Sequence, residues 1–472
     1  MLSNLIDLKS PAVFSVEIIM QAGLDFGTSN SAVGIGSATE AQLVRLENQQ
    51  HFLPSTLFTY DRNYVCDYIQ QNIAGSQKSI YQEQRAIQLR RAKTQKLAEG
   101  FQPSDQLVFF GNEAFNYYIE APEEGTFIKS PKSFLGATGL SERQVHFFED
   151  LVTAKMLNIK LQAENNLQAT LTNVVIGRPV NFQGVDSADS NHQAIRIMTE
   201  AATRCGYQNI EFLYEPLAAG IDFETDLRED ALVLVVDIGG GTTDCSMVKM
   251  GPSFVQKEDR SKDFIAHSGR RVGGNDLDIA LTFHQLMPLF GLGSDRENGL
   301  PIPSSPYWSA AAINHVAEQT NFYSDQTKQS IARLEAQARQ PELIRRFMQL
   351  QQYKLNHRLV KSAEETKIAL SDQLSYFLTL PYIESELGLT ITHAQLELAV
   401  EKQLRNILTL VKDCLNQASA TPSYIYLTGG SAKSPIIRAA LTKLLPEIEM
   451  VDGDYFGSVA AGLTKWANKI WR

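Results

Sequence analysis

The segment VVDIGGGTTDCSMV, Val235 to Val248, decides how the rest of this 472-residue chain is interpreted. An apolar run ends in Asp237, three glycines follow, and two threonines precede a second acid, Asp244. This pattern predicts two strands joined by a glycine-rich turn. A turn without side chains exposes several backbone N–H groups together, and such groups form a site for an anion. The carboxylate of Asp237 would repel that anion unless a hydrated Mg²⁺ lay between them.

The segment LDFGTSNSAVGI, Leu24 to Ile35, repeats the same order of residue types. Asp25 stands between apolar residues, Gly27 follows, and hydroxyl and amide residues precede a half-buried strand. One such pattern alone is most simply an ordinary hairpin, but two copies in one chain favour a shared site. Both parts of the chain contain a strand, a turn and a second strand, followed by a helix and a further strand. The repeat predicts an α/β protein made from two related halves.

Two further glycine pairs precede predicted helices. TGGSAKSP, residues 428–435, follows an apolar strand and leads into a helix expected over Ile436 to Leu445. RVGGNDLD, Arg271 to Asp278, leads into a helix that Asn or Asp would cap. Helix N-termini attract phosphate groups, so both pairs are candidate parts of a nucleotide site. Taken alone, either pair is equally compatible with a turn that binds nothing.

The composition is that of a soluble globular protein, with 43% hydrophobic and 20% charged residues. The net charge of −10 argues against a surface for nucleic acid or anionic membrane, because both need a basic field. The four cysteines are far apart and lack zinc spacing, which favours reduced thiols in a cytosolic protein. No apolar run approaches the ~18 residues of a transmembrane helix. P-loop, Rossmann and protein-kinase motifs are absent.

Together these motifs resemble the ATPase fold shared by actin, sugar kinases and the DnaK-type heat-shock chaperones, and the chaperone (Hsp70) family most closely. LDFGTSNS is similar to the family's first phosphate loop, VVDIGGGTTDCSMV to its second, and YIYLTGGSAKSPIIRAAL to its adenosine loop. VVIGRPVNF, YEPLAAGIDF and SGRRVGGNDLDIAL match other family segments, so the resemblance runs from about Ala22 to Leu463. It implies the actin-like ATPase (ribonuclease H-like) fold, with two duplicated lobes and inserted subdomains.

The resemblance also implies roles for individual residues. Asp25, Asp237 and Glu215 would hold Mg²⁺ through its water molecules, and Asp237 would orient the attacking water. Lys132, in SPKSFLG, would steer that water and offset charge on the γ-phosphate. The implied catalytic residues are Lys132, Asp237, Glu215 and Thr242, with Asp244 behind them. The implied ATP- or ADP-binding residues are Gly27, Thr28, Ser29, Asn30, Gly239, Gly240, Gly241, Thr242, Thr243, Gly273, Gly274, Glu364, Lys367, Ser371, Gly429, Gly430, Ser431 and Lys433.

The expected division of the chain follows from the repeat and the resemblance. Residues 1–21 are expected to be a loose extension or an upstream translation artefact, with Met20 as the alternative start. Residues 22–230 form lobe I, with a subdomain inserted at about 61–150, and residues 231–472 form lobe II, with a helical subdomain at about 273–388. No peptide-binding domain is expected.

Three features depart from the family pattern. Ile368 stands where the chaperones carry an arginine that packs on adenine, and Phe456 stands where they usually carry an acid. The adenine half of the site is therefore altered, whereas the phosphate half is intact. The region Phe290 to Leu359 is longer than in the family. Core packing is the favoured interpretation of its apolar positions, Ile331, Leu334, Leu343, Ile344, Phe347 and Leu350, ahead of a partner-binding face.

These observations predict a cytoplasmic, Mg²⁺-dependent ATPase that acts as a slow nucleotide switch. It resembles the short, YegD-like members of the family that carry the ATPase domain alone. Its output would go to a protein partner, and no nucleic acid or membrane is implied. A small-molecule (sugar) kinase, an actin-like filament protein and a non-catalytic nucleotide-binding scaffold remain alternatives.

Overall fold

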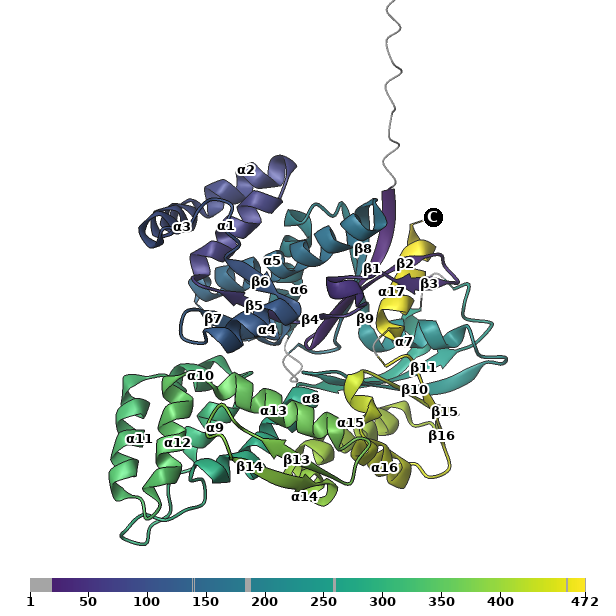
Figure 1. Ribbon diagram of the computed structural model, residues 1–472. Helices are drawn as coiled ribbons and strands as arrows, with labels where there is room; N and C mark the ends of the chain where they lie inside the picture. The colour runs from purple at the N-terminus through teal and green to yellow at the C-terminus, as the bar shows by residue number, and fades with distance from the viewer. Residues whose placement is uncertain are drawn as a thin grey trace, which may run out of the picture.

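The two lobes repeat one sheet topology. The computed structural model describes residues 19–137, 139, 141–182, 188–257, 260–455 and 457–471, and Figure 1 shows the lobes one above the other. The upper sheet has the order β3-β2-β1-β8-β9, with β4 beside β2, and the lower sheet has the order β12-β11-β10-β15-β16. In each sheet the first hairpin is antiparallel and the following strands pair in parallel. The matching orders confirm the predicted α/β duplication.

The strands of the two sheets lie close to the predicted segments. The upper strands are β1 (Ile19–Phe26), β2 (Asn30–Gly36), β3 (Ala41–Leu43), β4 (Leu53–Pro54), β8 (Thr170–Arg178) and β9 (Asn209–Tyr214). The lower strands are β10 (Ala231–Ile238), β11 (Thr243–Met250), β12 (Phe264–Arg270), β15 (Tyr424–Thr428) and β16 (Glu449–Asp452). Helices cover both faces of each sheet, so the central strands carry unbroken apolar runs. β1 begins at Ile19, and Met20 pairs with Leu171 of β8, so the folded part starts before the expected Ala22.

Helices between and around the sheets make the layers. They are α5 (Glu142–Leu167), α6 (Ala188–Arg204), α7 (Glu215–Glu224), α15 (Glu401–Ala418), α16 (Pro435–Leu444) and α17 (Ser458–Ile470). A capping box of Ser141 and Gln144 starts α5 at Glu142.

The C-terminal helix α17 crosses from the lower lobe to the upper one. It packs on β1, β2 and β8 and against α7, as Figure 1 shows. A Cβ atom at Gly462 would lie 1.7 Å from the Ala218 carbonyl oxygen, so the two helices touch through their backbones. The expected assignment of residues 231–472 to one lobe is therefore wrong for α17. Sequence order could not show this, because the contact depends on a long-range crossing.

The insert of the upper lobe is a three-stranded sheet with four helices. Its elements are β5 (Thr56–Thr59), α1 (Arg62–Asn72), α2 (Gly75–Gln84), α3 (Ala86–Glu99), β6 (Val108–Phe110), α4 (Gly111–Glu120) and β7 (Thr126–Lys129). The insert begins with β5, before the expected residue 61. It ends before residue 142, because α5 packs on α6 and belongs to the lobe core. The polar stretch at 70–99 forms the end of α1 and the helices α2 and α3.

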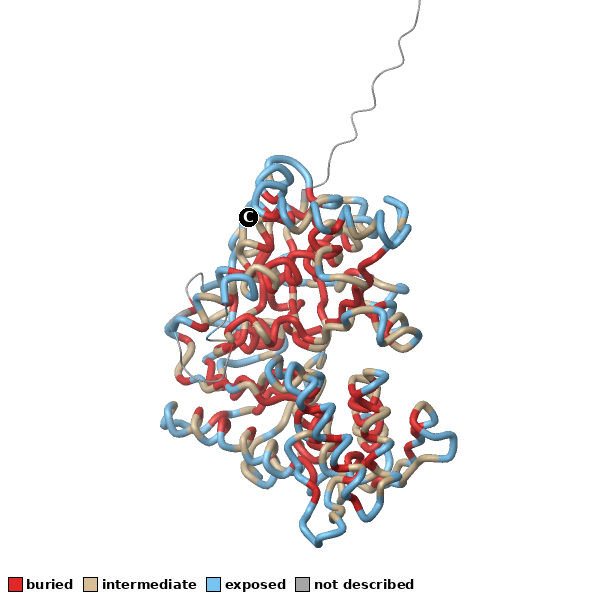
Figure 2. Tube along the Cα trace, turned by 90° about the vertical axis from the view of Figure 1, so that its left-hand side faces the viewer, coloured by how far each residue is buried: buried red, intermediate tan, exposed pale blue. Residues whose placement is uncertain are grey.

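The insert of the lower lobe is mainly helical. Its elements are α8 (Gly274–Leu281), α9 (Ser305–Ala311), α10 (Val316–Phe322), α11 (Asp325–Gln337), α12 (Pro341–Gln352), α13 (Asn356–Ala369), β13 (Ser375–Thr379), β14 (Gly388–Thr392) and α14 (His393–Ala399). The apolar positions of α11 and α12 are buried, except for half-buried Leu343, which confirms core packing as their role. Figure 2 shows buried residues running through the centre of both lobes. The hairpin of β13 and β14 ends at Thr392, past residue 388, where this insert was expected to end.

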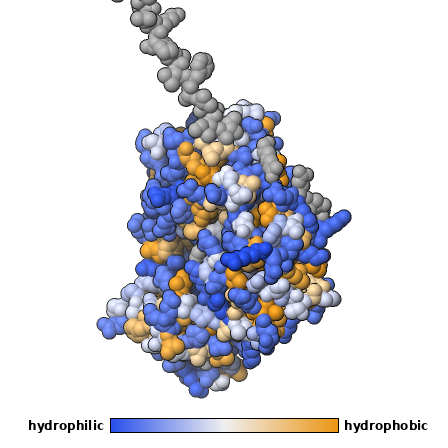
Figure 3. All heavy atoms as spheres, turned by 90° about the vertical axis from the view of Figure 1, so that its right-hand side faces the viewer, coloured by the Kyte–Doolittle hydropathy of each residue, from blue (hydrophilic) through white to orange (hydrophobic). Residues whose placement is uncertain are grey.

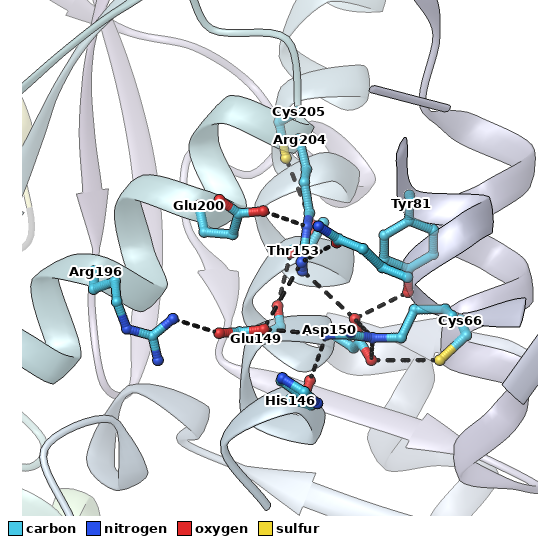
Figure 4. Close-up of polar contacts among 12 residues, drawn as sticks. Cys66, Tyr81, His146, Glu149, Asp150, Thr153, Arg196, Glu200, Arg204 and Cys205 are labelled. Carbon is cyan, nitrogen blue, oxygen red and sulfur yellow. Dashed lines mark hydrogen bonds and ion pairs between the residues drawn. The ribbon is translucent and has the colours of Figure 1, made fainter. Parts of the chain in front are cut away.

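A buried ion-pair cluster holds α2 and α3 on the upper lobe. Arg85, between these two helices, places Nε 2.9 Å from Asp150 Oδ2 and Nη2 3.1 Å from Glu149 Oε2. Tyr81 donates its hydroxyl to Asp150 at 3.0 Å, and Arg204 lies 3.6 Å from the same carboxylate. Figure 4 shows Tyr81 of α2, Glu149 and Asp150 of α5 and Arg204 of α6 converging on one another. The insert is therefore fixed to the core by charge as well as by apolar packing.

The outer surface carries both apolar and hydrophilic residues. On the side drawn in Figure 3, apolar residues are scattered among hydrophilic ones. Within the described ranges, no helix has both the length and the apolar character needed to span a membrane.

Candidate functional site

Two turns face each other between the lobes. Loop 1 (residues 27–29) joins β1 to β2, and loop 2 (residues 239–242) joins β10 to β11. A Cβ atom at Gly240 would lie 1.7 Å from Ser29 Oγ, and one at Gly241 would also overlap loop 1. The glycines of loop 2 therefore allow the two turns to approach each other. The Gly239 N–H closes loop 2 by donating to the Thr242 carbonyl at 3.0 Å.

Four carboxylates gather beside the two loops. They come from the ends of matching strands and the start of α7: Asp25, Asp237, Asp244 and Glu215. Burial and the charge of Glu215 raise the pKa of Asp25 to about 7. Burial and the neighbouring carboxylates raise the pKa of Asp237 well above its ordinary value. The same causes raise the pKa of Asp244 to about 8, so this cluster holds an excess of negative charge that a cation would relieve.

These carboxylates suit a hydrated cation. Among the described residues, no group of three or more His, Cys, Asp or Glu side chains is arranged to hold a metal ion directly. Mg²⁺ prefers carboxylate and phosphate oxygens and usually keeps several waters, so it can be held at longer range by separate carboxylates. The donor set therefore fits Mg²⁺ bound through water.

Lys132 supplies a fixed positive charge to this cluster. It lies in the short 3₁₀ helix η2 (Pro131–Phe134), it is buried, and its Nζ forms an ion pair with Glu215 Oε1. It borders a small cavity together with Thr28 and Thr242, rather than the main cleft. The structure thus brings Lys132 to the predicted carboxylates from behind the loops.

A cleft of about 840 Å³ opens between the lobes and contains most of the predicted site. The predicted residues that line it are Asp25, Gly27, Thr28, Ser29, Asn30, Glu215, Asp237, Gly239, Gly240, Thr242, Gly274, Glu364, Lys367, Ser371, Gly429, Gly430, Ser431 and Lys433. Its volume is within the roughly 300–1,000 Å³ that small-molecule sites occupy.

Charged side chains of α13 line the end of the cleft away from the carboxylates. Lys367 Nζ lies 2.6 Å from Oδ1 of Asp278, in the middle of α8. Burial acts to raise the pKa of Glu364, but three neighbouring lysines outweigh it and lower that pKa to about 2. Glu364 is therefore an ionised acceptor, suited to hydroxyl groups of a ligand.

The turn at residues 429–433 braces loop 2. A Cβ atom at Gly429 would lie 2.6 Å from Asp237 Oδ1, and Ser431 Oγ donates to the Gly239 carbonyl at 3.2 Å. On the opposite wall, Ile368 is 56% exposed and lines the cleft. One cleft therefore joins an anion-binding end to an end with an apolar wall and hydrogen-bonding groups.

Comparison with known proteins identifies the family. The family model described as Hsp70 protein matches residues 21–289. This match covers more than half of the chain and includes both glycine loops and all four carboxylates. The chain belongs to the Hsp70 family.

Individual Hsp70-family relatives are distant and longer. The chain is 23% identical over 462 residues to the chaperone protein DnaK of Carsonella ruddii, covering 95% of this chain and 63% of that protein. It is 23% identical over 319 residues to a chaperone protein HscA homolog of Pseudoalteromonas atlantica, covering 66% of this chain and 44% of that protein. It is 25% identical over 288 residues to an HscA homolog of Rickettsia felis, covering 59% and 37%. The chain thus spans less than two thirds of the length of these relatives. The Hsp70 family comprises chaperones that bind ATP or ADP.

Four residues predicted for the site of this Hsp70-family chain do not line the main cleft. Thr243 is fully buried and donates its hydroxyl to the Val272 carbonyl, so it does not reach the cleft. Thr242, the last residue of loop 2, lines the cleft instead. Gly273 lies behind loop 2, whereas Gly241 and Lys132 border the small cavity. Phe456 lies outside the described residues.

Several residues of the cleft were not predicted from the sequence. They are Ser31, Phe52, Asn275, Leu277, Asp278, Asp372, Ser434, Arg438, Asp452, Tyr455 and Val459. Arg438 donates to Tyr455 at 3.0 Å and pairs with Asp452. Asp278 could have been found, because it lies in the segment that contains the Gly-Gly pair of α8. Arg438 and Tyr455 have no local motif, since only the fold brings them together.

Contacts between the two inserts join the lobes next to Glu364 of the cleft, and we call this set the cleft latch. Lys129 of β7 pairs with Glu364 of α13 at 3.2 Å. Lys354 Nζ donates to the Glu123 carbonyl at 3.2 Å, and the Tyr118 hydroxyl donates to the Lys354 carbonyl. The His357 ring lies edge-on to the rings of Tyr118 and Phe127, with centroids 5.7 and 5.2 Å away. The latch joins the two inserts, whereas the α7–α17 crossing joins the cores of the lobes.

Lowering the pH is expected to open the cleft latch. Burial, with help from the charge of Lys129, lowers the pKa of His357 from 6.5 to about 3 in the closed cleft. An opened latch would return this pKa toward 6.5, so protonation favours the open form. The contribution of His357 to closure is complete above pH 6.5 and falls as the pH drops, by about tenfold in the closed-to-open ratio at pH 5.5.

Energy transfer between dyes on the two inserts would measure this change. The dyes can be placed at exposed positions by Ser104→Cys and Ser330→Cys. The carboxylates beside the loops also titrate near neutral pH, so the matched control is His357→Phe, which keeps a ring but cannot be protonated. An identical pH response in both proteins would contradict the role of His357.

Proposed function

We propose that this chain is a Mg²⁺-dependent ATP-binding protein that hydrolyses ATP slowly and serves as a nucleotide switch. The cleft carries this proposal. Two opposed glycine loops and four carboxylates form one end, while α13 and residues 429–433 form the other. Such a cleft can bind a charged phosphate chain and a nucleoside at the same time.

Phosphate binding is assigned to the backbone N–H groups of loops 1 and 2, with the side chains of Thr28, Ser29, Asn30 and Thr242. Asp25, Asp237 and Glu215 would hold Mg²⁺ through its waters. When bound, this ion neutralises phosphate charge. Asp237 would also orient the attacking water and accept a proton from it. Lys132 would offset the charge that develops on the terminal phosphate.

The sugar and base of the nucleotide are assigned to the end of the cleft away from the carboxylates. Glu364, Lys367 and Ser371 of the α13 region would contact the sugar, and residues 429–433 would contact the base. Ile368 presents an apolar surface there, so base stacking would lack a cationic partner.

The output of the switch is proposed to be the angle between the lobes, read by a protein partner. The α7–α17 crossing and the cleft latch would both act on that movement. We also propose a cytoplasmic location, which the four free, buried cysteines support. The acidic net charge favours a protein partner over nucleic acid or an anionic membrane.

Calorimetry with ATP and ADP, with and without Mg²⁺, followed by phosphate release, tests the proposal. We expect binding of both nucleotides, at least about tenfold weaker after chelation of Mg²⁺, and slow release of phosphate. Absence of Mg²⁺-dependent heat with either nucleotide would contradict it. Binding without phosphate release would favour the non-catalytic scaffold. ADP formation that depends on a sugar would favour the kinase, and ATP-dependent sedimentation would favour the filament protein.

A further inference from the structure

Ser55, between β4 and β5, is hydrogen-bonded to two separate parts of the phosphate site. It is 1% exposed. Its N–H donates to the Ser29 carbonyl and its Oγ donates to the Gly27 carbonyl, both at 2.7 Å. Its own carbonyl accepts the Ser130 N–H at 2.7 Å. Loop 1 and the turn that carries Lys132 are therefore joined through one buried residue.

Lys155 lies directly behind Ser55. It projects from the middle of α5, it is 1% exposed, and its Nζ donates to Ser55 Oγ. The same Nζ lies 4.8 Å from the centroid of the Phe26 ring. Because Lys155 occupies an acceptor position of the hydroxyl, the hydroxyl hydrogen is directed to the Gly27 carbonyl.

A buried amine is unfavourable unless its few contacts are kept. Burial and the charge of Lys132 lower the pKa of Lys155 well below its ordinary value, and Asp25 opposes this change. None of the steps assigned to hydrolysis uses Lys155, so its position calls for another role.

The turn before Lys132 depends on outside support. Ser130 has φ of 59°, in the left-handed region that residues other than glycine rarely adopt. Pro131 follows it and further restricts this backbone. Ser130 accepts the Ser133 N–H within the turn at 2.9 Å. From outside the turn it is held by the bond to the Ser55 carbonyl and by the bond from Asn275 Nδ2 to its Oγ at 3.2 Å. Without Ser55, the turn could relax and carry Lys132 with it.

We propose that Ser55 and Lys155 are positioning residues of the phosphate site. Lys155 fixes the direction of the Ser55 hydroxyl, and Ser55 keeps loop 1 and the Lys132 turn in one mutual arrangement. The kinetic consequences rest on the proposed ATPase function, whereas the structural link does not need nucleotide. A displacement of about 1 Å between such groups lowers a reaction rate by up to about 100-fold.

Amide hydrogen exchange without nucleotide tests the link directly. Lys155→Met keeps the aliphatic stem and removes the amine, so residues 26–31 and 128–133 should both exchange at least about tenfold faster. The matched control is Lys160→Met on the same helix. Lys160 is also buried, pairs with Glu164 and lies 5.2 Å from the Tyr207 ring, but has no contact with the loops. Unchanged exchange in either segment of the Lys155 variant would overturn the proposal, whatever the outcome for ATP hydrolysis.

A double-mutant cycle tests the effect on the reaction. Ser55→Ala should lower kcat by about 10- to 100-fold and change ADP affinity by less than about threefold. In the Lys132→Ala background the further loss should be smaller by at least about threefold, because part of the effect of Ser55 passes through the placement of Lys132. The same factor of loss in both backgrounds would indicate general destabilisation and overturn the proposal. If Lys155→Met does not fold, Ser55→Ala serves for the exchange measurement as well.

Discussion

Replacement of Lys132 by alanine is expected to slow ATP hydrolysis by about 100- to 1,000-fold while changing nucleotide affinity by less than about threefold. Phosphoryl transfer is catalysed mainly by positioning and by charges aimed at the transferring group. Lys132 is a buried cation beside the carboxylates, held by its ion pair with Glu215, so its charge needs no reorganisation during the reaction. It borders the rear of the loops rather than the main cleft, so binding of the nucleotide should depend on it little.

Single-turnover hydrolysis after mixing with MgATP would measure the chemical step separately from product release. Lys129→Ala is the matched control, because Lys129 lies three residues earlier and pairs with Glu364 of the cleft. We expect that control to speed nucleotide release and to leave the single-turnover rate within about threefold of wild type. Equal single-turnover rates for wild type and Lys132→Ala would remove Lys132 from the reaction.

The phosphate end of the site could be predicted from sequence because its signals are local. Asp25 and Asp237 follow apolar runs and precede glycines, and each such pattern reports a strand that ends at a turn. The repeat then placed the two turns in equivalent positions of two equivalent sheets. Equivalent strands with the same order in both sheets are what the structure shows. The local residue pattern and the internal repeat were therefore sufficient to predict the phosphate end of the site.

Two residues that were wrongly predicted to line the cleft show the limit of a prediction from the local sequence. Thr242 and Thr243 were treated alike, although Thr242 ends loop 2 and lines the cleft, whereas Thr243 begins β11 and bonds Val272. Gly273 follows a strand and precedes a helix, yet its close neighbours are the backbone atoms of loop 2. In both cases the residue type was suitable, and the direction in which the backbone presents it decided the outcome.

The residues that were missed depend on contacts across long stretches of sequence. Ser55 and Lys155 are 100 positions apart, and no spacing rule connects them. The same holds for α17, whose apolar face is evident from sequence although the sheet that it covers is not. Buried lysines are also hard to identify in advance, because an isolated lysine is usually exposed. Tertiary contacts alone distinguish Lys155 from a surface lysine.

The second large effect is expected from Arg85, at the centre of the buried ion-pair cluster between α2 and α5. Arg85→Met should destabilise the upper lobe by about 3–5 kcal/mol, because removal of one partner leaves buried carboxylates without compensation. Its side chain is 4% exposed and contacts both Glu149 and Asp150, so water cannot replace it easily. Thermal unfolding should begin several degrees lower than in wild type. The matched control is Arg91→Met, at an exposed position of α3, which should have little effect.

The pH dependence of this loss tests its cause. Burial raises the pKa of Asp150 above its ordinary value even though Arg85 and Arg204 oppose the rise. Removal of Arg85 should raise it further, so the folded variant takes up a proton at higher pH than the unfolded chain. Stability of the variant relative to wild type should therefore recover as the pH falls from about 8 to about 5. A deficit that is constant with pH would indicate that lost packing, rather than an unpaired carboxylate, causes the loss.

A compensating substitution separates the two causes at neutral pH. Asp150→Asn in the Arg85→Met background removes the negative charge that the arginine balanced, while Tyr81 can still donate to the amide oxygen. If the unpaired charge dominates, the double variant should unfold at a higher temperature than Arg85→Met alone, and most of the loss should be recovered. A double variant as unstable as the sum of its two single variants would show that the cluster acts through packing and hydrogen bonds.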